Sequence, residues 1–220
     1  MKSGAILLGC LGILLVAAVV FIMFGVGVNN RLVTLEEGVS GQWAQVQSAY
    51  QRRADLIPNL IRTVEGAADF ERGTLQDVVE ARSRVGSIQM GADLTGNPDA
   101  FRQFEQAQAG LSSALSRLLV VVERYPELRA NQNFLELQSQ LEGTENRINV
   151  ERVRYNEAAQ AFNTAIRRFP ATLIAGLLGF ERKTYFQAET GADQAPDVNF
   201  DFGREPGTAA PQVPAPATQP

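Results

Sequence analysis

The sequence contains no histidine and only one cysteine among its 220 residues. Histidine is the commonest general base and metal ligand, so its absence removes most catalytic triads, zinc sites and di-iron sites of helical bundles. The single cysteine, Cys10, lies in an apolar run near the start of the chain, so the remainder can form neither a disulfide nor a thiolate metal site. We therefore expect no catalytic activity, no cofactor and no metal.

An excess of positive charge is also lacking. The chain has 20 basic and 24 acidic residues, with a net charge of −4. Basic residues are spread along the sequence with acidic neighbours, whereas a nucleic-acid-binding protein concentrates them on one surface. We expect no nucleic-acid partner.

What the sequence does have is a long apolar run, residues 5–28, without a charged side chain. As a helix it would extend about 36 Å, slightly more than the roughly 30 Å hydrocarbon core of a bilayer. The run continues into Asn29, Asn30 and Arg31 without a small-residue cleavage site, which favours a permanent single-pass anchor over a cleaved signal peptide. We expect membrane lipid to contact this segment.

Two further features of the run concern lipidation and orientation. Leu7-Leu8-Gly9-Cys10 is similar to a lipobox, but only about five apolar residues precede Cys10, fewer than a lipoprotein signal uses. Lys2 and the terminal amine oppose Arg31 across the span, and this small excess of positive charge predicts an N-terminus in the cytoplasm. The rest of the chain would then lie on the extracytoplasmic side.

After the run, apolar side chains recur at the three- and four-residue spacing of amphipathic helices, and no stretch alternates as a strand does. The spacing predicts helices over residues 31–67, 70–90, 98–125 and 131–168. We expect Pro58 to kink the first of these helices. The fold class is all-α: a transmembrane helix followed by an antiparallel four-helix bundle, in which two long outer helices run full height and two shorter ones fill one end.

The boundaries of these helices have local signals. Asn97-Pro98-Asp99 is an N-cap followed by a first-turn proline and an acidic first turn, and residues 91–97 before it are expected to form a loop. Gly66 and Gly73 favour a break between the first two helices. The alternative is one helix to about residue 90, because four later positions keep the earlier phase: Val78, Ala81, Val85 and Ile88.

The last predicted helix has the most regular repeat, typical of a coiled-coil packing seam. An apolar or aromatic residue recurs every seven positions: Phe134, Leu141, Ile148, Tyr155, Phe162 and Phe169.

Several short motifs resemble the LemA family over about residues 5–188. The resemblance implies a bacterial single-pass membrane protein of the inner membrane with a helical-bundle domain and no established enzymatic activity. Members are often encoded near a membrane metalloprotease or a TPM-domain protein, which points to quality control in the envelope. The motifs that carry it are Trp43, YQRRADLIPNL at 50–60, YPEL at 125–128 followed by Phe134, LEGTENRI at 141–148, Tyr155-Asn156, Phe162-Asn163, Phe169-Pro170 and Gly179-Phe180.

Charged residues stand on or beside the apolar seams, where burial is costly unless they are paired. Arg53 lies about as far from the membrane edge as Glu145 lies from the end of its helix, so antiparallel neighbours would bring the two level. We hypothesise an Arg53–Glu145 ion pair that fixes the register. The alternative is a ligand or partner site lined by the wider polar set: Arg53, Asp55, Asn59, Glu145, Arg152, Asn156 and Asn163.

A dense apolar segment follows the last helix and must be covered by something. It either meets the membrane interface, where aromatic and basic residues suit, or caps the bundle core. Its main members are Phe169, Leu173, Leu177, Phe180, Tyr185 and Phe186.

We thus expect an anchor at residues 1–30, a bundle at 31–190 and a disordered Pro/Ala-rich tail at 191–220. The leading functional hypothesis is a membrane-tethered interaction or scaffold protein, with a protein partner or self-association. The alternatives are a lipid- or peptide-binding module and, as a third class, an enzyme built on Asp55 and Glu145.

Overall fold

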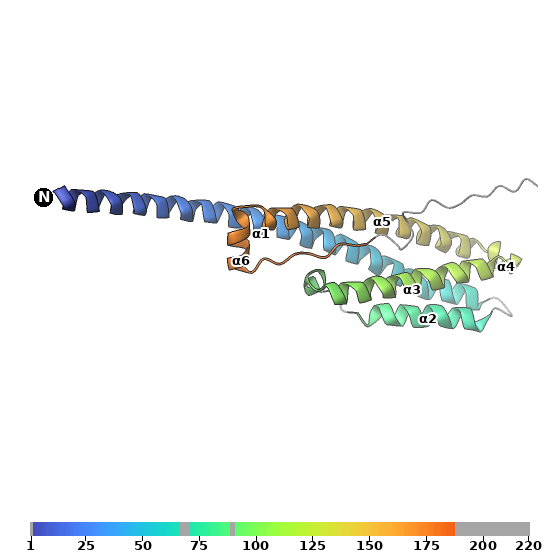
Figure 1. Cartoon of the computed structure of the whole chain (residues 1–220). Helices are drawn as coiled ribbons and strands as arrows, with labels where there is room; N and C mark the ends of the chain where they lie inside the picture. Colours follow the sequence, from blue (N-terminus) through green and yellow to red (C-terminus); the bar gives the residue numbers. More distant parts are fainter. Residues whose placement is uncertain (1, 67–70, 89–90, 188–220) are drawn as a thin grey trace, which may run out of the picture. The chain divides into compact units, whose positions relative to one another are not determined.

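The computed structural model describes residues 2–66, 71–88 and 91–187, and every regular element in these ranges is helical. This confirms the predicted all-α class (Figure 1). The expected tail at 191–220 lies outside the described residues. The elements in chain order are α1 (Lys2–Glu65), α2 (Arg72–Gly86), the 3-10 helix η1 (Ala92–Gly96), α3 (Pro98–Val122), α4 (Pro126–Arg129), α5 (Gln132–Arg167) and α6 (Ala171–Leu178).

Helix α1 is uninterrupted from the apolar run into the bundle (Figure 1). The boundary expected near residue 30 falls inside it, because no proline or capping signal stands there and the buried stripe begins at once with Leu32. The Thr34 hydroxyl also donates to the Asn30 carbonyl oxygen at 2.8 Å across the junction. Among the described residues this is the one helix long and apolar enough to cross a membrane. The bundle is thus joined to that apolar length by continuous helix.

Pro58 lies inside α1 without ending it. Proline has no amide hydrogen, so the carbonyl oxygen of Ala54, four residues earlier, loses its helical donor. Arg82 of α2 supplies a replacement, its Nε lying 3.4 Å from that oxygen. The chain therefore tolerates the proline partly through a contact with the next helix.

Helices α2 and α3 form a pair that packs beside the part of α1 farther from the apolar run, here called its outer half (Figure 1). α1 ends at Glu65, so the two predicted helices are separate rather than one helix to residue 90. The Asn97 side chain accepts hydrogen bonds from the amides of Asp99 and Ala100, which confirms the predicted cap of α3. The expected loop at 91–97 was wrong in part, since it contains η1. Pro126 begins the short α4 four residues after Val122, the last residue of α3.

Helix α5 packs against α1 in antiparallel orientation over the length of the bundle (Figure 1). Five of the six heptad positions are buried, as the seam predicts. The sixth, Phe169, is 80% exposed because α5 ends at Arg167, before the repeat is complete.

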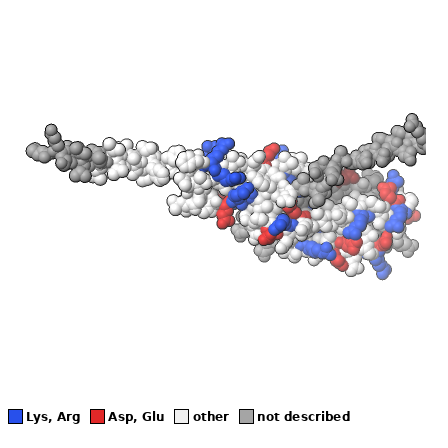
Figure 2. All heavy atoms as spheres, viewed as in Figure 1, with Lys and Arg blue, Asp and Glu red and all other residues white. Residues whose placement is uncertain are grey.

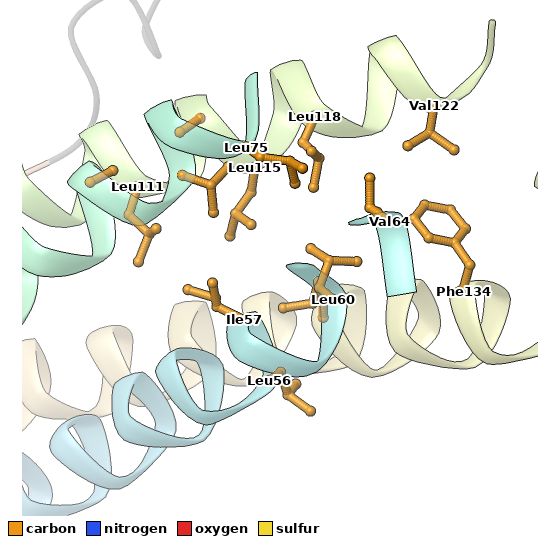
Figure 3. Packing of buried hydrophobic residues seen from close by; sticks show 14 of the residues in the cluster. Leu56, Ile57, Leu60, Val64, Leu75, Leu111, Leu115, Leu118, Val122 and Phe134 are labelled. Atoms are coloured by element: carbon orange, nitrogen blue, oxygen red, sulfur yellow. The ribbon is translucent and has the colours of Figure 1, made fainter. Parts of the chain in front are cut away.

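The core divides into two clusters along this axis. The outer cluster is aliphatic and joins α1, α2, α3 and α5 around residues such as Ile57, Leu118 and Phe134 (Figure 3). The inner cluster, closer to the apolar run, is rich in aromatic rings. Its centre is Trp43, whose ring lies 5.5 Å from Tyr155 and 6.1 Å from Phe186, centroid to centroid.

The chain turns back after α5. Helix α6 packs against α1 and α5 and ends at Gly179, whose φ of 75° is a left-handed conformation that glycine adopts without steric cost. Residues 180–187, here called the strap, then run without regular structure along the bundle (Figure 1). The Thr184 amide donates to the carbonyl oxygen of Thr95 at 2.8 Å, which ties the strap to η1.

Candidate functional site

Arg53 of α1 is the centre of a polar layer, here called the arginine layer, between the two core clusters. Its guanidinium Nη1 lies 2.7 Å from a Glu145 carboxylate oxygen and 2.8 Å from the Ser112 hydroxyl, and its Nη2 donates to Gln108. The ion pair expected from the antiparallel register is therefore present. It is joined by two polar residues of α3 that the sequence analysis did not single out.

The burial of this layer is uneven. The Arg53 side chain is 3% exposed, whereas that of Glu145 is 44% exposed. Arginine presents five donors in a fixed fork, and three acceptors from two helices meet this one. Within the described residues, Arg53 Nε and Gln108 Nε2 have no partner. The layer thus costs desolvation energy that an apolar layer would not, which supports a role in register or recognition rather than in bulk stability.

Tyr50 borders the layer, with the Arg53 guanidinium 5.2 Å from its ring centroid. Burial raises the pKa of Tyr50 to about 12, and the positive charges of Arg152 and Arg53 oppose the rise without cancelling it. Burial likewise raises the pKa of Tyr155. Both phenols therefore stay protonated near neutral pH and cannot act there as general bases.

Two members of the predicted polar set stand apart from the layer. Asp55 is exposed and accepts a hydrogen bond from Gln51 on the same helix at 2.8 Å, and Asn59 is exposed and bonded to Arg62. The carboxylate pair that an enzyme would need, Asp55 with Glu145, is thus divided between an exposed face and the arginine layer.

Arg152 of α5 contacts both Glu105 of α3 and Phe186 of the strap. Its guanidinium lies 3.6 Å from a Glu105 carboxylate oxygen and stands over the ring of Phe186, 4.7 Å from the centroid. Because α1 and α5 are antiparallel, Arg53 pairs with Glu145, and Arg152 has its own acidic partner in Glu105.

Asn156 and Asn163 clamp the backbone of the strap. Each uses its side-chain amide both ways: Asn156 donates to the Phe186 carbonyl oxygen at 3.0 Å and accepts from the Phe186 amide at 2.9 Å. Asn163 does the same with Lys183, at 2.8 and 2.9 Å. Between these clamps the Tyr155 hydroxyl donates to the Thr184 carbonyl oxygen at 2.9 Å.

The spacing of the clamps follows from two backbone geometries. Seven residues of α-helix rise about 10.5 Å, and three residues of extended chain cover about 10 Å. A heptad pair of asparagines is therefore in register with every third residue of an extended segment. These hydrogen bonds all go to backbone atoms, and the side chains of the strap make separate contacts with α5, such as that of Phe186 with Tyr155 at 5.5 Å between ring centroids.

The predicted apolar segment divides in two. Phe186 is buried, and Phe180 and Tyr185 pack on the inner cluster, so these three cap the core. Phe169, Leu173 and Leu177 are exposed. The core-capping interpretation therefore holds for the later part of the segment, and contact of the exposed earlier part with the membrane interface stays a prediction.

Two other features escaped the sequence analysis. Glu151 is buried, with its carboxylate 3.3 Å from Arg154, and it stands three residues after the seam position Ile148. That three-residue spacing could have revealed it. A surface pocket of about 660 Å³ also opens between α1, η1 and the strap, with Glu36, Trp43 and Lys183 in its lining. Among the described residues, no group of three metal-ligating side chains could hold an ion.

A helical bundle on a continuous apolar helix defines the class: a membrane-associated helical-bundle protein. The chain belongs to the LemA family, whose sequence model matches residues 42–200. This confirms the resemblance seen in the motifs. The match begins inside α1, after the apolar run.

Named relatives agree with the family. Magnetosome proteins MamQ 1 and MamQ 2 of Paramagnetospirillum magneticum are each 27% identical over 183 residues, which cover 74% of this chain and 66% of theirs. Protein LemA of Metamycoplasma hominis is 24% identical over 169 residues, covering 77% of this chain and 73% of its own. The chain thus spans slightly less than two thirds of the magnetosome relatives it matches.

Proposed function

We propose that the chain is a membrane-anchored interaction or scaffold protein without catalytic activity, which presents its bundle on the extracytoplasmic side of a bacterial inner membrane. The continuity of α1 carries the proposal: one helix joins the apolar run to both core clusters, so the bundle is held rigidly rather than on a flexible linker. The polar residues of the bundle bond to one another and to the strap, which supports a structural use for them.

The sharpest test breaks the rigid connection and leaves both ends intact. Four glycines inserted between Asn30 and Arg31 should disrupt α1 there, because glycine disfavours helix by roughly 1 kcal/mol per residue. The full-length chain, carrying a photo-crosslinking residue at exposed Val120 of α3, is compared in its native membrane with the insertion variant. We expect a discrete crosslinked partner, or a second copy, that the insertion removes.

Two further readouts separate the elements of this proposal. Both proteins should resist alkaline extraction, and a membrane-impermeant maleimide should label Val153→Cys from outside intact cells in a Cys10→Ser background. Release of the chain without detergent would overturn the anchor. Labelling only after lysis would overturn the orientation, and crosslinks that survive the insertion would overturn rigid presentation.

A second candidate, a peptide-binding module, is favoured by the strap itself. A segment held through its backbone by Asn156 and Asn163 is chemically a bound extended peptide that happens to be covalently attached. A protease site inserted after Gly179 of the full chain would free one end. After cleavage, a labelled peptide of residues 180–187 should exchange into the groove, and Asn156→Ala with Asn163→Ala should abolish the exchange. Lack of saturable exchange in the cleaved parent protein would remove this candidate.

A further inference from the structure

Helix α6 presents an apolar face that no described part of the chain covers. Leu173 and Leu177 stand four residues apart in α6, which places them on one side of the helix, and they are 63% and 86% exposed. Phe169, two residues before the helix begins, is 80% exposed. No charged residue occurs between Phe169 and Phe180. Other exposed apolar side chains of the bundle, such as Val79 and Val120, lie on helices that also carry charged residues. Such a patch marks a contact with something apolar.

The opposite side of α6 shows where along α1 the helix sits. A methyl group built on Gly25 would lie 4.0 Å from Ile174 Cδ1, an ordinary van der Waals distance. Ala175 is buried in the inner cluster together with Leu32. Gly25 lies within the apolar run, so α6 packs at the membrane-side end of the bundle, beside a part of α1 whose apolar side chains, Phe24 among them, are exposed.

Helix dimensions place this level relative to a bilayer. From residue 5 to Gly25 the helix rises about 30 Å, the thickness of a hydrocarbon core. From Gly25 to Arg31 it rises about 9 Å further, close to the depth of a headgroup layer. A helix level with Gly25 therefore lies at the boundary between acyl chains and headgroups, where interfacial amphipathic helices insert.

The charges around α6 fit the same boundary. Four exposed arginines flank the patch in sequence or on α1: Arg31, Arg167, Arg168 and Arg182. No ion pair joins any of these four to another residue that the structure describes. Figure 2 shows Lys and Arg side chains gathered where the uncharged length of α1 enters the bundle. We call these four arginines the basic collar.

From this arrangement we infer that α6 is a second membrane-contacting element, an interfacial helix that inserts Phe169, Leu173 and Leu177 among lipid acyl chains while the basic collar binds headgroup phosphates. This rests on the anchoring proposed above and deepens it. The occupant is lipid because α6 packs beside the apolar length of α1, which is itself proposed to lie in lipid, and because the arginines of the basic collar flank the patch. The bundle then has two attachments to the membrane, which restricts its tilt.

The test uses the full-length chain with Cys10→Ser, reconstituted in vesicles of phosphatidylcholine with phosphatidylglycerol. A polarity-sensitive fluorophore is attached at Leu177→Cys, and at Val120→Cys as the matched exposed control on α3. We expect emission from position 177 to shift to shorter wavelength and to be quenched by lipids carrying a nitroxide near the headgroup. The control should instead be quenched by aqueous iodide.

The possible outcomes distinguish the proposals. Vesicle flotation reports the anchor separately: a protein that does not float contradicts the anchoring, whereas one that floats with position 177 open to iodide contradicts only the inference. A blue shift without lipid quenching, together with energy transfer between labelled copies, assigns the face to a second copy and also overturns it. The double variant Leu173→Glu with Leu177→Glu should still float with the vesicles. A fluorophore at Phe169→Cys in that variant should no longer be protected from iodide.

A separate measurement in the same vesicles tests the basic collar. Quenching at position 177 should be stronger with phosphatidylglycerol than with phosphatidylcholine alone, and Arg167→Gln with Arg168→Gln should remove that difference. The control pair Arg117→Gln with Arg124→Gln, on the outer half, should leave it unchanged. Equal quenching in both lipids for the parent protein would overturn the phosphate-binding role of the collar.

Discussion

The two halves of the bundle are stabilised by different means. The outer half is an aliphatic core of four helices, held by contacts that have little directional preference (Figure 3). The inner half has only α1, α5 and parts of α3, α6 and η1, and it compensates with aromatic rings and a strap fixed by hydrogen bonds. In the inner half, where fewer helices pack together, the chain relies on aromatic contacts and on hydrogen bonds of defined geometry.

The arginine layer separates these halves. Its members come from α1, α3 and α5, so it forms where these three helices contribute side chains at one level of the bundle. A shift of register by one residue would move Arg53 away from Glu145. The layer therefore has the position expected of a register device, a role that the following experiments can measure.

The largest expected effect is from Trp43→Ala, which removes the centre of the inner cluster. Deleting a buried aromatic side chain costs about 3–5 kcal/mol of unfolding free energy, since a cavity remains. Leu118→Ala in the outer cluster should cost about 2–5 kcal/mol by the same mechanism. Urea unfolding of the reconstituted chain, followed by far-UV circular dichroism, gives both values.

The comparison depends on what else these two variants change. Only Trp43→Ala should expose the strap, because Trp43 contacts Phe186 and Leu118 does not lie in that cluster. Hydrogen exchange at the amides of Lys183 and Phe186 checks this. Equal loss of protection in both variants would mean that the halves are one cooperative unit.

Raising the pH should weaken the inner half through Tyr50. Its pKa is about 12 in the folded chain and 10.0 for a solvated tyrosine, so between these values the unfolded chain loses a proton that the folded chain keeps. Stability is therefore independent of this group below about pH 10 and falls above it, by about 2–3 kcal/mol near pH 12. Tyr50→Phe should reduce the fall above pH 10 and leave the share of Tyr155, whose pKa burial also raises. A curve unchanged by the substitution would contradict the assignment.

Removing the charge of Glu145 with Glu145→Gln should cost about 1–3 kcal/mol. Breaking a fully buried pair costs about 3–5 kcal/mol, but Glu145 is 44% exposed and water can replace part of its contact with Arg53. A double-mutant cycle with Arg53→Met measures the coupling. The exposed pair Arg117 and Asp77, 3.9 Å apart, serves as the control, since Arg117→Gln should change stability by less than about 0.5 kcal/mol.

Periodicity predicted most of the fold and some of the site. Helix geometry, which acts within one helix or between two straight helices, accounts for three correct predictions: the α5 seam, the Asn97 cap and the equal height of Arg53 and Glu145. The strap could not be foreseen in this way. Its path depends on the turn at Gly179 and on contacts between residues 20–30 positions apart, and the segment has no repeat of its own.

The polar set shows the same limit. The predicted polar set includes Asn156 and Asn163, but the sequence does not say that an extended segment is the partner of both. Asp55 and Asn59 lie near Arg53 in sequence and yet face solvent, because helix residues two or six positions apart do not share a face. Gln108 and Ser112 join the layer from α3, whose position depends on the whole bundle.

The smallest change in global stability should come from Asn156→Ala with Asn163→Ala. Four hydrogen bonds to strap backbone are lost, but the freed amides and carbonyls can turn to water, so we expect only about 1 kcal/mol in urea unfolding. Locally the effect should be large, with hydrogen-exchange protection lost at Lys183 and Phe186. Asn149→Ala, at the preceding heptad position and exposed, is the matched control and should leave both amides protected. If the double variant keeps that protection, the aromatic contacts of Phe186 hold the strap in place and the asparagine hydrogen bonds do not.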